Sequence, residues 1–277
     1  MSYKIVGDSC TELPEELRRD EHFCRVALTL QIGEEMIPDD ESFDQKSFLK
    51  KMKESSEAAR SACPSPEAFM EAFEGAEEIY VITLSSVLSG SYNSAELAKA
   101  LYLEKHPNKK IEVFDSKSAA SGQTLIAMKI KECKDAGMEF EEVVACVNKF
   151  RDNLKTKFVL ESLENFRKNG RLNRKIAALC SVLNIKPVMC GVDGDIERID
   201  QARGMDRAIM KMIKHIEEDV TNAKERICAI VHCNCFARAE FVRKEIQKRV
   251  SFKKIMILDA TGVSSLYANE GGIVVAY

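Results

Sequence analysis

The sequence predicts an α/β protein of two domains: an N-terminal three-layer domain on a parallel sheet, residues 1–155, and a C-terminal two-layer domain on a mixed sheet, residues 156–277. Three observations lead to this prediction. A chain of 277 residues is long for one hydrophobic core. Up to about residue 155, strands alternate with polar loops and helices, which is typical of a parallel sheet covered by helices. Beyond it, a hairpin and closely spaced strands indicate a mixed or antiparallel sheet with helices on one face.

Each strand predicted in the first part is a short run rich in β-branched or aromatic residues, and several of the helices follow a residue suited to a helix N-terminus. The turn chemistry around Gly33 indicates a hairpin that returns into an edge strand. Asp44 is expected to cap a helix. In chain order, the pattern predicts strands at 4–6, 23–30, 79–84 and 111–114, a hairpin at 32–37, and helices from about 15, 44–53, 66, 91, 123–136 and 140–154.

The segment 60–66 contains Pro64 and Pro66, which forbid a helix across it. We therefore expect an extended loop until Ser65, which is suited to capping the helix that begins at Pro66. Ser61 lies in this loop and again places a hydroxyl before a helix.

The second part begins with a strand and is punctuated by glycines. Gly191 to Gly194 is a strong hairpin turn, and Ile209, Met212 and Ile213 recur with helical spacing. In chain order, the pattern predicts strands at 158–160, 182–190, 196–202, 227–231, 254–258 and 273–277, and helices at 163–168, 175–181, around 209–216, and at 236–248.

The apolar run 79–84 stops in a loop rich in hydroxyl groups, and a helix begins near Ser91. Free backbone N–H groups and the helix dipole make such a junction favourable for an anion, and Ser85, Ser86 and Ser89 add hydroxyl donors. Gly90 lets the backbone approach a ligand closely. The alternative is that one serine is an N-cap and the others are turn residues.

Polar residues also end two other predicted strands, as Asp8-Ser9 and Asp115-Ser116. Ligands of open parallel sheets bind beyond the carboxyl ends of the strands, so these pairs and the Ser85 loop are expected at one site. The chain has no Gly-x-Gly-x-x-Gly or Walker pattern, which argues against a dinucleotide or nucleoside triphosphate.

Composition excludes several classes of function. The 41 basic and 44 acidic residues give a net charge of −3, and no basic stripe with interleaved aromatics is present, so nucleic acid is not an expected partner. No apolar run approaches a membrane span, and the N-terminal sequence does not resemble a signal peptide. Ten scattered cysteines suit reduced, buried thiols. We therefore expect a cytoplasmic protein.

The segment His232-Cys233-Asn234-Cys235 offers three soft metal ligands in four residues. No second Cys/His pair follows at zinc-site spacing, and a strand places neighbouring side chains on opposite faces. We interpret it as a strand end and expect no metal.

With these elements placed, the chain resembles the DegV family of bacterial fatty-acid-binding proteins. The likeness covers nearly the whole length, and its motifs occur in order. They are Asp8-Ser9, Ser61-Ala62-Cys63-Pro64-Ser65-Pro66, Leu88-Ser89-Gly90-Ser91-Tyr92-Asn93-Ser94-Ala95, Asp115-Ser116-Lys117-Ser118, Phe158-Val159-Leu160-Glu161-Ser162-Leu163, Asn169-Gly170-Arg171-Leu172, Asn184-Ile185-Lys186-Pro187 and Ala202-Arg203.

The resemblance implies one long-chain fatty acid between two α/β domains, with its carboxylate held by hydroxyl groups and its tail buried. It assigns the head group to Ser61, to Ser89 with its neighbours Ser86 and Ser91, and to Arg171. It further implies a protein without catalysis or cofactor of its own, which presents the fatty acid to a separate fatty-acid kinase.

One segment departs from the family. Fatty-acid-binding members resemble one another in a His-x-Gly-Pro-Gly segment whose histidine reaches the carboxylate, whereas this chain has Tyr267-Ala268-Asn269-Glu270-Gly271-Gly272. Asn269 is the expected substitute donor. Glu270 would repel a carboxylate unless its side chain faces away.

Two alternatives remain open. In the first alternative, the absence of the family histidine means that the protein binds a different acidic, lipid-like metabolite. In the second alternative, the protein is a serine hydrolase that acts through Ser86 or Ser89. Such an enzyme needs a histidine base, for which the chain has four candidates, but the Gly-x-Ser-x-Gly motif is missing. The fatty-acid hypothesis further predicts that the Ser61 and Ser89 hydroxyls lie within about 6 Å of each other, so that one carboxylate accepts from both.

Overall fold

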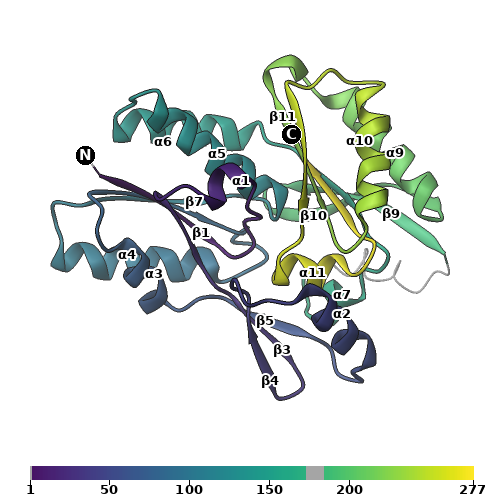
Figure 1. Ribbon diagram of the computed structural model, residues 1–277, viewed down its shortest axis with the longest axis horizontal. Coiled ribbons are helices and arrows are strands. Elements are labelled where there is room, and N and C mark those ends of the chain that lie inside the picture. The colour runs from purple at the N-terminus through teal and green to yellow at the C-terminus, as the bar shows by residue number, and fades with distance from the viewer. Residues whose placement is uncertain (1, 173–183) are drawn as a thin grey trace.

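The computed structural model describes residues 2–172 and 184–277 (Figure 1). The described strands form three sheets. Sheet A has four strands, sheet B has three and sheet C has six. The predicted helix at 175–181 and the beginning of the strand predicted from 182 lie outside the described residues.

Sheet A is entirely parallel, in the order β2-β1-β6-β7. Helices on one face bury Phe69, Phe73 and Ala98 against it, and helices on the other face bury Ile126 and Val143. This arrangement confirms the predicted three-layer α/β architecture. The strands are β1 (Tyr3–Asp8), β2 (Phe23–Val26), β6 (Glu78–Thr83) and β7 (Lys110–Asp115), and the helices are α1 (Glu15–Arg18), α3 (Pro66–Phe73), α4 (Ser91–Lys105), α5 (Ser121–Asp135) and α6 (Phe140–Asp152).

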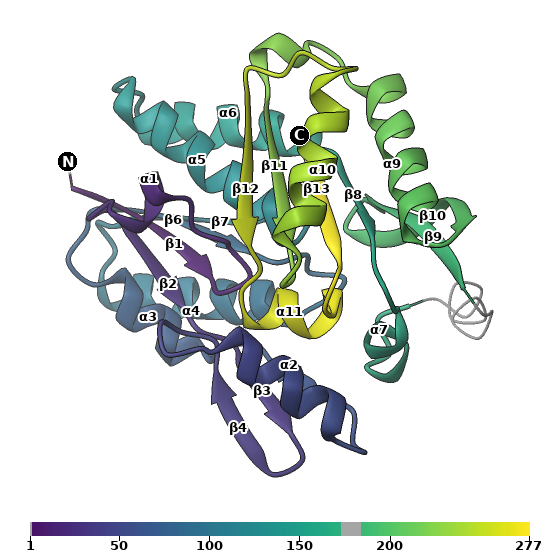
Figure 2. The ribbon, with the colours of Figure 1, turned by 45° about the vertical axis from the view of Figure 1, so that its right-hand side comes forward.

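Sheet B is a small antiparallel sheet below sheet A in Figure 2, in the order β4-β3-β5. Its strands are β3 (Thr29–Ile32), β4 (Glu35–Pro38) and β5 (Arg60–Ala62). The predicted hairpin joins β3 to β4, and Gly33 has φ +57° there. Helix α2 (Gln45–Glu54) follows, and the predicted cap is present because Asp44 accepts a hydrogen bond from Ser47 N at 3.1 Å.

Two predictions for this region were wrong. The single strand predicted at 23–30 is two strands, β2 in sheet A and β3 in sheet B. An alternating pattern reports which residues are buried but not which strand is the partner, so it cannot show the change of sheet. The loop predicted at 60–66 begins as β5, because a proline at 64 excludes a helix without excluding a strand before it.

Sheet C is mixed, in the order β10-β9-β8-β13-β11-β12, with β11 and β12 as its parallel pair. The β9–β10 hairpin turns at Asp193 and Gly194, which both have positive φ. Its strands are β8 (Thr156–Val159), β9 (Ile185–Val192), β10 (Asp195–Arg203), β11 (Ile227–His232), β12 (Lys254–Asp259) and β13 (Ile273–Ala276). The helices of this part are α7 (Glu164–Lys168), α9 (Met205–Asp219), α10 (Phe236–Gln247) and α11 (Gly262–Ala268), with a 3₁₀ turn at Ala223–Glu225.

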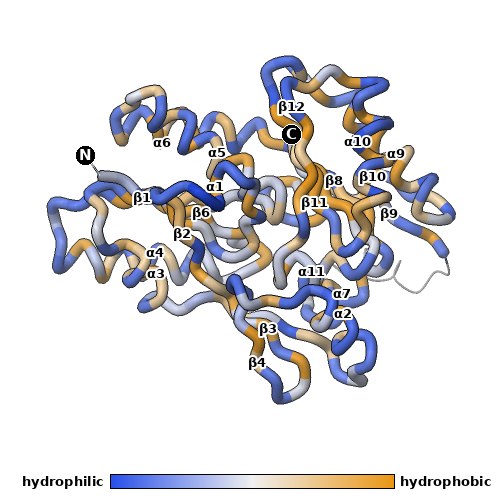
Figure 3. Tube along the Cα trace, viewed as in Figure 1, coloured by the Kyte–Doolittle hydropathy of each residue, from blue (hydrophilic) through white to orange (hydrophobic). Residues whose placement is uncertain are grey.

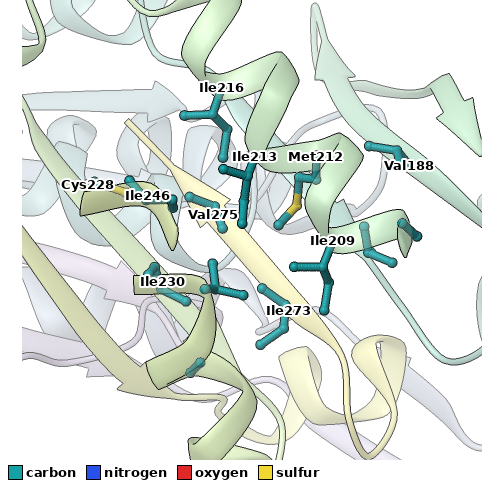
Figure 4. Packing of buried hydrophobic residues seen from close by; sticks show 14 of the residues in the cluster. Val188, Ile209, Met212, Ile213, Ile216, Cys228, Ile230, Ile246, Ile273 and Val275 are labelled. Carbon is teal, nitrogen blue, oxygen red and sulfur yellow. The ribbon is translucent and has the colours of Figure 1, made fainter. Parts of the chain in front are cut away.

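Helices α9 and α10 cover one face of sheet C, as predicted. Figure 4 shows Ile209, Ile213 and Ile216 of α9 directed at Ile230 and Val275 of the sheet. These side chains are fully buried, and each contributes about 1.5–3 kcal/mol by leaving water. In Figure 3 the hydrophobic colour follows most of β11, whose residues after the first are buried.

The other face of sheet C meets α5, which lies between the two large sheets and contacts β1, β6, β11 and β13. Leu125 of α5 packs with Ala229 and Met256 of sheet C, whereas Ile126 and Ile130 pack against sheet A. The strands of sheets A and B all precede residue 155 and those of sheet C all follow it. The division into domains at that residue stays a prediction.

Helix α11 was not predicted. It has seven residues, six of them buried, and no side-chain cap bond at its N-terminus. A short helix buried on nearly every side shows no amphipathic period, so the usual sequence signal is absent. Within residues 2–172 and 184–277, no helix has the length and apolar content to cross a bilayer.

Candidate functional site

A cavity of about 300 Å³ lies where the loops after sheet A, strand β5, helix α11 and the inner face of sheet C meet. Its surface is mainly apolar. The apolar walls include Leu84, Leu88, Phe158, Leu160, Phe166, Ile196, Val263 and Val274. Polar groups from several elements interrupt these walls, which is the usual composition of a small-molecule site.

The strand-end residues meet as predicted from the parallel sheet. Asp8 at the end of β1 is fully buried and accepts from Leu84 N at 2.8 Å, Ser91 Oγ at 2.7 Å and Gln123 Nε2 at 2.7 Å. Burial raises the pKa of Asp8, and these donors oppose the rise. The carboxyl group therefore fixes both ends of the serine-rich loop between β6 and α4.

A second carboxylate and a backbone carbonyl fix the middle of this loop. Asp115 at the end of β7 accepts from the Ser86 backbone N at 3.1 Å and from Ser86 Oγ at 2.5 Å. Ser85 Oγ donates to Gly194 O at 2.6 Å, which ties the loop to the β9–β10 hairpin. These bonds fix the loop to β7 and to the β9–β10 hairpin without the help of a ligand.

Four of the seven predicted site residues line the cavity: Ser61, Ser89, Gly90 and Arg171. Ser89 Oγ accepts from Ser91 N at 3.2 Å, which leaves its own proton unused in that bond. Arg171 Nε donates to Leu88 O at 3.2 Å, so the guanidinium is anchored beside the same loop. The predicted 6 Å separation of the Ser61 and Ser89 hydroxyls stays a prediction.

A side chain at Gly90 would be crowded. A Cβ atom there would lie 3.2 Å from Cys63 Sγ, which also lines the cavity. The glycine therefore lets the loop approach the segment after β5 closely.

The other three predicted residues are engaged elsewhere. Ser86 donates to the half-buried Asp115, and Ser91 donates to the fully buried Asp8, as described above. Asn269 Nδ2 donates to Ser162 O and to Tyr267 O, each at 3.3 Å. None of the three is among the described residues that line the cavity. Their contacts are those of residues that shape the site, and a ligand contact for them stays a proposal.

Glu270 faces away from the cavity. Its Oε1 accepts from Asn234 Nδ2 at 2.7 Å in the turn after β11, and the side chain is exposed. Repulsion of a bound carboxylate is therefore avoided by orientation and by solvent screening.

Sequence reasoning missed three residues. Tyr267 of α11 lines the cavity, and Asp39 accepts from Gly262 N at 2.6 Å and Val263 N at 2.9 Å at the start of that helix. Glu12 is fully buried behind it, and burial raises its pKa to about 8. Because α11 was not predicted, nothing in the sequence marked residues that bind or belong to it.

The histidines do not support the hydrolase hypothesis. The described part of the cavity lining contains no histidine. His22 contacts Tyr3 O, His106 packs on Tyr102, and His215 lies by Asp200. A serine needs a base within hydrogen-bond reach, and none of the four is placed to serve Ser86 or Ser89.

The cysteine-rich strand end has ordinary partners. His232 Nε2 lies 3.3 Å from Asp259 Oδ1, and its Nδ1 accepts from Cys235 N at 3.3 Å. Burial raises the pKa of the Cys233 thiol to about 12. Within the described residues, no three His, Cys, Asp or Glu side chains are arranged to hold a metal ion.

The comparisons with known proteins agree with this architecture. A family model described as "Uncharacterised protein, DegV family" matches residues 2–277. A DegV domain-containing protein of Streptococcus gordonii is 35% identical over 280 residues, which cover 100% of this chain and 99% of that protein.

Two solved structures are similar over the full length. The first is a DegV family protein from Ruminococcus gnavus with vaccenic acid, at 46% identity and a TM-score of 0.96, with 100% of both chains covered. The second is the Streptococcus pneumoniae Fatty Acid Kinase (Fak) B3 protein loaded with linoleic acid, at 34% identity and a TM-score of 0.93, with 100% of this chain and 99% of that chain covered.

Proposed function

The chain belongs to the DegV family, and from this premise we propose that it binds one long-chain fatty acid in the cavity and presents the head group to a separate fatty-acid kinase. The observation that carries the proposal is a single cavity with apolar walls whose polar lining includes Ser61, Ser89 and Arg171. The vaccenic and linoleic acids in the two similar structures support the ligand class.

The apolar walls account for the affinity. Burial of about fifteen methylene groups at ~0.8 kcal/mol each gives on the order of 12 kcal/mol before ordering costs. Tight binding therefore needs no covalent bond and no metal.

The polar groups orient the ligand. Ser89 has a hydroxyl proton to donate, and Arg171 places a permanent positive charge in the lining. A carboxylate that accepts from such groups is held by charge-assisted hydrogen bonds, which are stronger than neutral ones. The head group then lies beside the loop that Asp8 and Asp115 fix.

In this proposal the separate kinase, and not this protein, phosphorylates the fatty acid. In this chain the described cavity lining offers no histidine base to a serine, and the sequence contains no nucleotide-binding glycine pattern. The kinase would supply ATP and metal, and this protein would hold the acyl chain. We place both in the cytoplasm, where the nine described cysteines would remain free thiols.

Lipid extraction tests the ligand. The protein purified from bacteria is analysed by native mass spectrometry before and after denaturing extraction, and the delipidated protein is titrated with oleate and palmitate. We expect one long-chain fatty acid per chain and submicromolar dissociation constants. Extracts without fatty acid, together with no binding at micromolar oleate, contradict the proposal. An extracted metabolite of another class supports the alternative acidic ligand.

The carrier role needs a second experiment. Protein loaded with oleate is mixed with a fatty-acid kinase from the same organism and ATP, and acyl phosphate is measured as a hydroxamate. Product is expected only when both proteins are present. Product formed by this protein alone contradicts a carrier without catalysis.

A further inference from the structure

The hydroxyl groups of Tyr267 and Ser61 meet at the wall of the cavity. Tyr267 Oη lies 3.3 Å from Ser61 Oγ, although the residues are 206 positions apart in sequence. Tyr267 comes from α11 and Ser61 from β5, and both line the cavity. Helix α11 thus places the phenol of Tyr267 beside Ser61, a residue already proposed to bind the head group.

The bond between these hydroxyls is weak and leaves a donor available. Hydroxyl pairs usually approach to about 2.7–2.8 Å, so 3.3 Å is long. Either oxygen fits the role of donor. Each hydroxyl carries one proton, and the bond between them uses one of the two. The other proton is available to an acceptor in the cavity.

The tyrosine ring is held in place. It packs against Phe166 with the ring centroids 4.6 Å apart and the planes at 41°, and Phe166 lines the same cavity. The start of α11 is fixed because Asp39 accepts from its first two backbone N–H groups. The phenol is therefore oriented by packing rather than by its bond to Ser61, so it loses little freedom when a ligand binds.

We propose that Tyr267 is a head-group ligand, and that its phenol and the Ser61 hydroxyl donate together to the carboxylate of the fatty acid. The inference rests on the proposed function and adds a residue to it. Binding replaces one long hydroxyl–hydroxyl bond by two hydrogen bonds to a charged acceptor. Such bonds are about twice as strong as neutral ones, so the exchange favours an ionised head group.

The test replaces Tyr267 by Phe, which removes the hydroxyl and keeps the ring on Phe166. Dissociation constants are measured for oleate and for oleyl alcohol, which has the same tail and no charge. For Y267F we expect oleate to bind about tenfold to a hundredfold more weakly and the alcohol about fivefold or less. The matched control is Y102F, which removes a phenol that contacts Phe73 O away from the cavity and is expected to leave both constants unchanged.

A double variant tests the shared acceptor. S61A/Y267F should lose less oleate affinity than the product of the two single losses, because the side chains serve one carboxylate. Equal losses for oleate and the alcohol indicate a packing effect and overturn the inference, as does unchanged oleate binding by Y267F. If Y267F does not fold, the losses of affinity for oleate and for oleyl alcohol are compared in S61A instead. Wild-type protein that binds no fatty acid overturns the proposed function itself, a result distinct from these.

Discussion

Three carboxyl groups behind the cavity, Asp8, Glu12 and Asp39, are buried to 1% exposure or less. Burial raises the pKa of each, and that of Glu12 to about 8. Asp8 and Asp39 are surrounded by strong donors. The Ser264 hydroxyl and long contacts of 3.4–3.5 Å from Thr261 to Glu12 Oε1 only partly oppose this rise, and Glu12 Oε2 has no partner among the described residues. Glu12 therefore keeps its proton at neutral pH, whereas the donors around Asp8 and Asp39 oppose the rise in the pKa of these two groups.

Replacing Glu12 by Gln should flatten the dependence of stability on pH. The folded-state pKa of about 8 is above the ordinary value of 4.5, so between these pH values the folded state binds more protons than the unfolded state. The free energy of unfolding therefore falls as pH rises from about 4.5 through 8, by up to about 1.4 kcal/mol per pH unit. E12Q cannot titrate and should fall less steeply.

Urea denaturation at pH 5, 6.5 and 8 measures this difference. The control is E54Q, which removes an exposed carboxylate and should follow the wild-type curve. Parallel curves for E12Q and wild type would show that Glu12 is already ionised at pH 5.

Two serines of the loop between β6 and α4 should differ in function, Ser89 in ligand binding and Ser86 in stability. S89A is expected to weaken oleate binding about tenfold, because it removes a donor at the cavity wall. S86A is expected to change oleate affinity less than about threefold and instead to lower stability by about 1–2 kcal/mol, because Asp115 loses a hydrogen bond. Calorimetric titration and thermal denaturation of both variants measure the two effects. The reverse pattern would move the head group to Ser86.

At the scale of residues, the sequence predicted where the serine-rich loop lies better than it predicted what each of the proposed site residues contacts. Ser61, Ser89 and Arg171 were placed in the site by motif order, and they line one cavity. Ser91 and Asn269 have the same chemistry as the polar residues that line the cavity, and their partners are set by tertiary contacts with Asp8 and Ser162. Residue type and spacing do not show which way a hydroxyl or amide points.

At the scale of elements, α11 is the part of the site whose own sequence contributes least to its stability and position. Its first residue is a glycine in close contact with other elements: a Cβ at Gly262 would lie 2.7 Å from both Asp39 Oδ1 and Leu30 Cδ1 and would displace these side chains. Asp39 in turn accepts from Ser9 Oγ at 2.8 Å. A seven-residue helix has little stability alone, so contacts from sheet B and the β1 loop determine its position.

Asp39→Asn should loosen α11 and the cavity together. One carboxylate oxygen becomes an NH₂ group that faces a backbone N–H or the Ser9 hydroxyl, which costs about 2 kcal/mol of stability. Because Val263 and Tyr267 of α11 line the cavity, oleate affinity should fall as well. Hydrogen exchange of the α11 amides and oleate titration measure the two changes.

The neighbouring residue provides the control. Asp40 is half-buried, and its carboxylate accepts from the backbone N and the hydroxyl of Ser42, two positions along the chain. Because an amide oxygen can accept the same local bonds, D40N should change stability by less than about 0.5 kcal/mol. Equal effects of D39N and D40N would contradict the role of Asp39 as the anchor of α11.

At the scale of the whole molecule, the cavity is a joint product of the two large sheets. Leu84 and Leu88 follow β6 of sheet A, whereas Phe158 and Val274 come from sheet C. The alternation of strands and helices predicted the parallel sheet, and the hairpin predicted the mixed one. The β3–β4 hairpin of sheet B was predicted, but its pairing with β5 and helix α11 were missed. Both depend on partners distant in sequence, which local patterns do not report.

A ligand that contacts both sheets should stabilise the entire fold. At a free oleate concentration a hundred times its dissociation constant, binding adds about 2.7 kcal/mol to the free energy of unfolding. For a chain of this size that corresponds to a rise of about 5–10 °C in Tm. Thermal scans of delipidated protein with oleate, and with octanoate as the short-chain control, measure the shift. The same small shift for both acids would indicate that the long tail is not buried.

The position of α5 between the sheets has a consequence for how the chain assembles. A fragment that ends at residue 155 retains every strand of sheet A, yet it exposes the Leu125 face that Ala229 and Met256 cover in the complete protein. Exposed apolar faces of that kind promote aggregation. The N-terminal half is therefore unsuited to independent production, and the two halves should melt in one cooperative transition rather than in sequence.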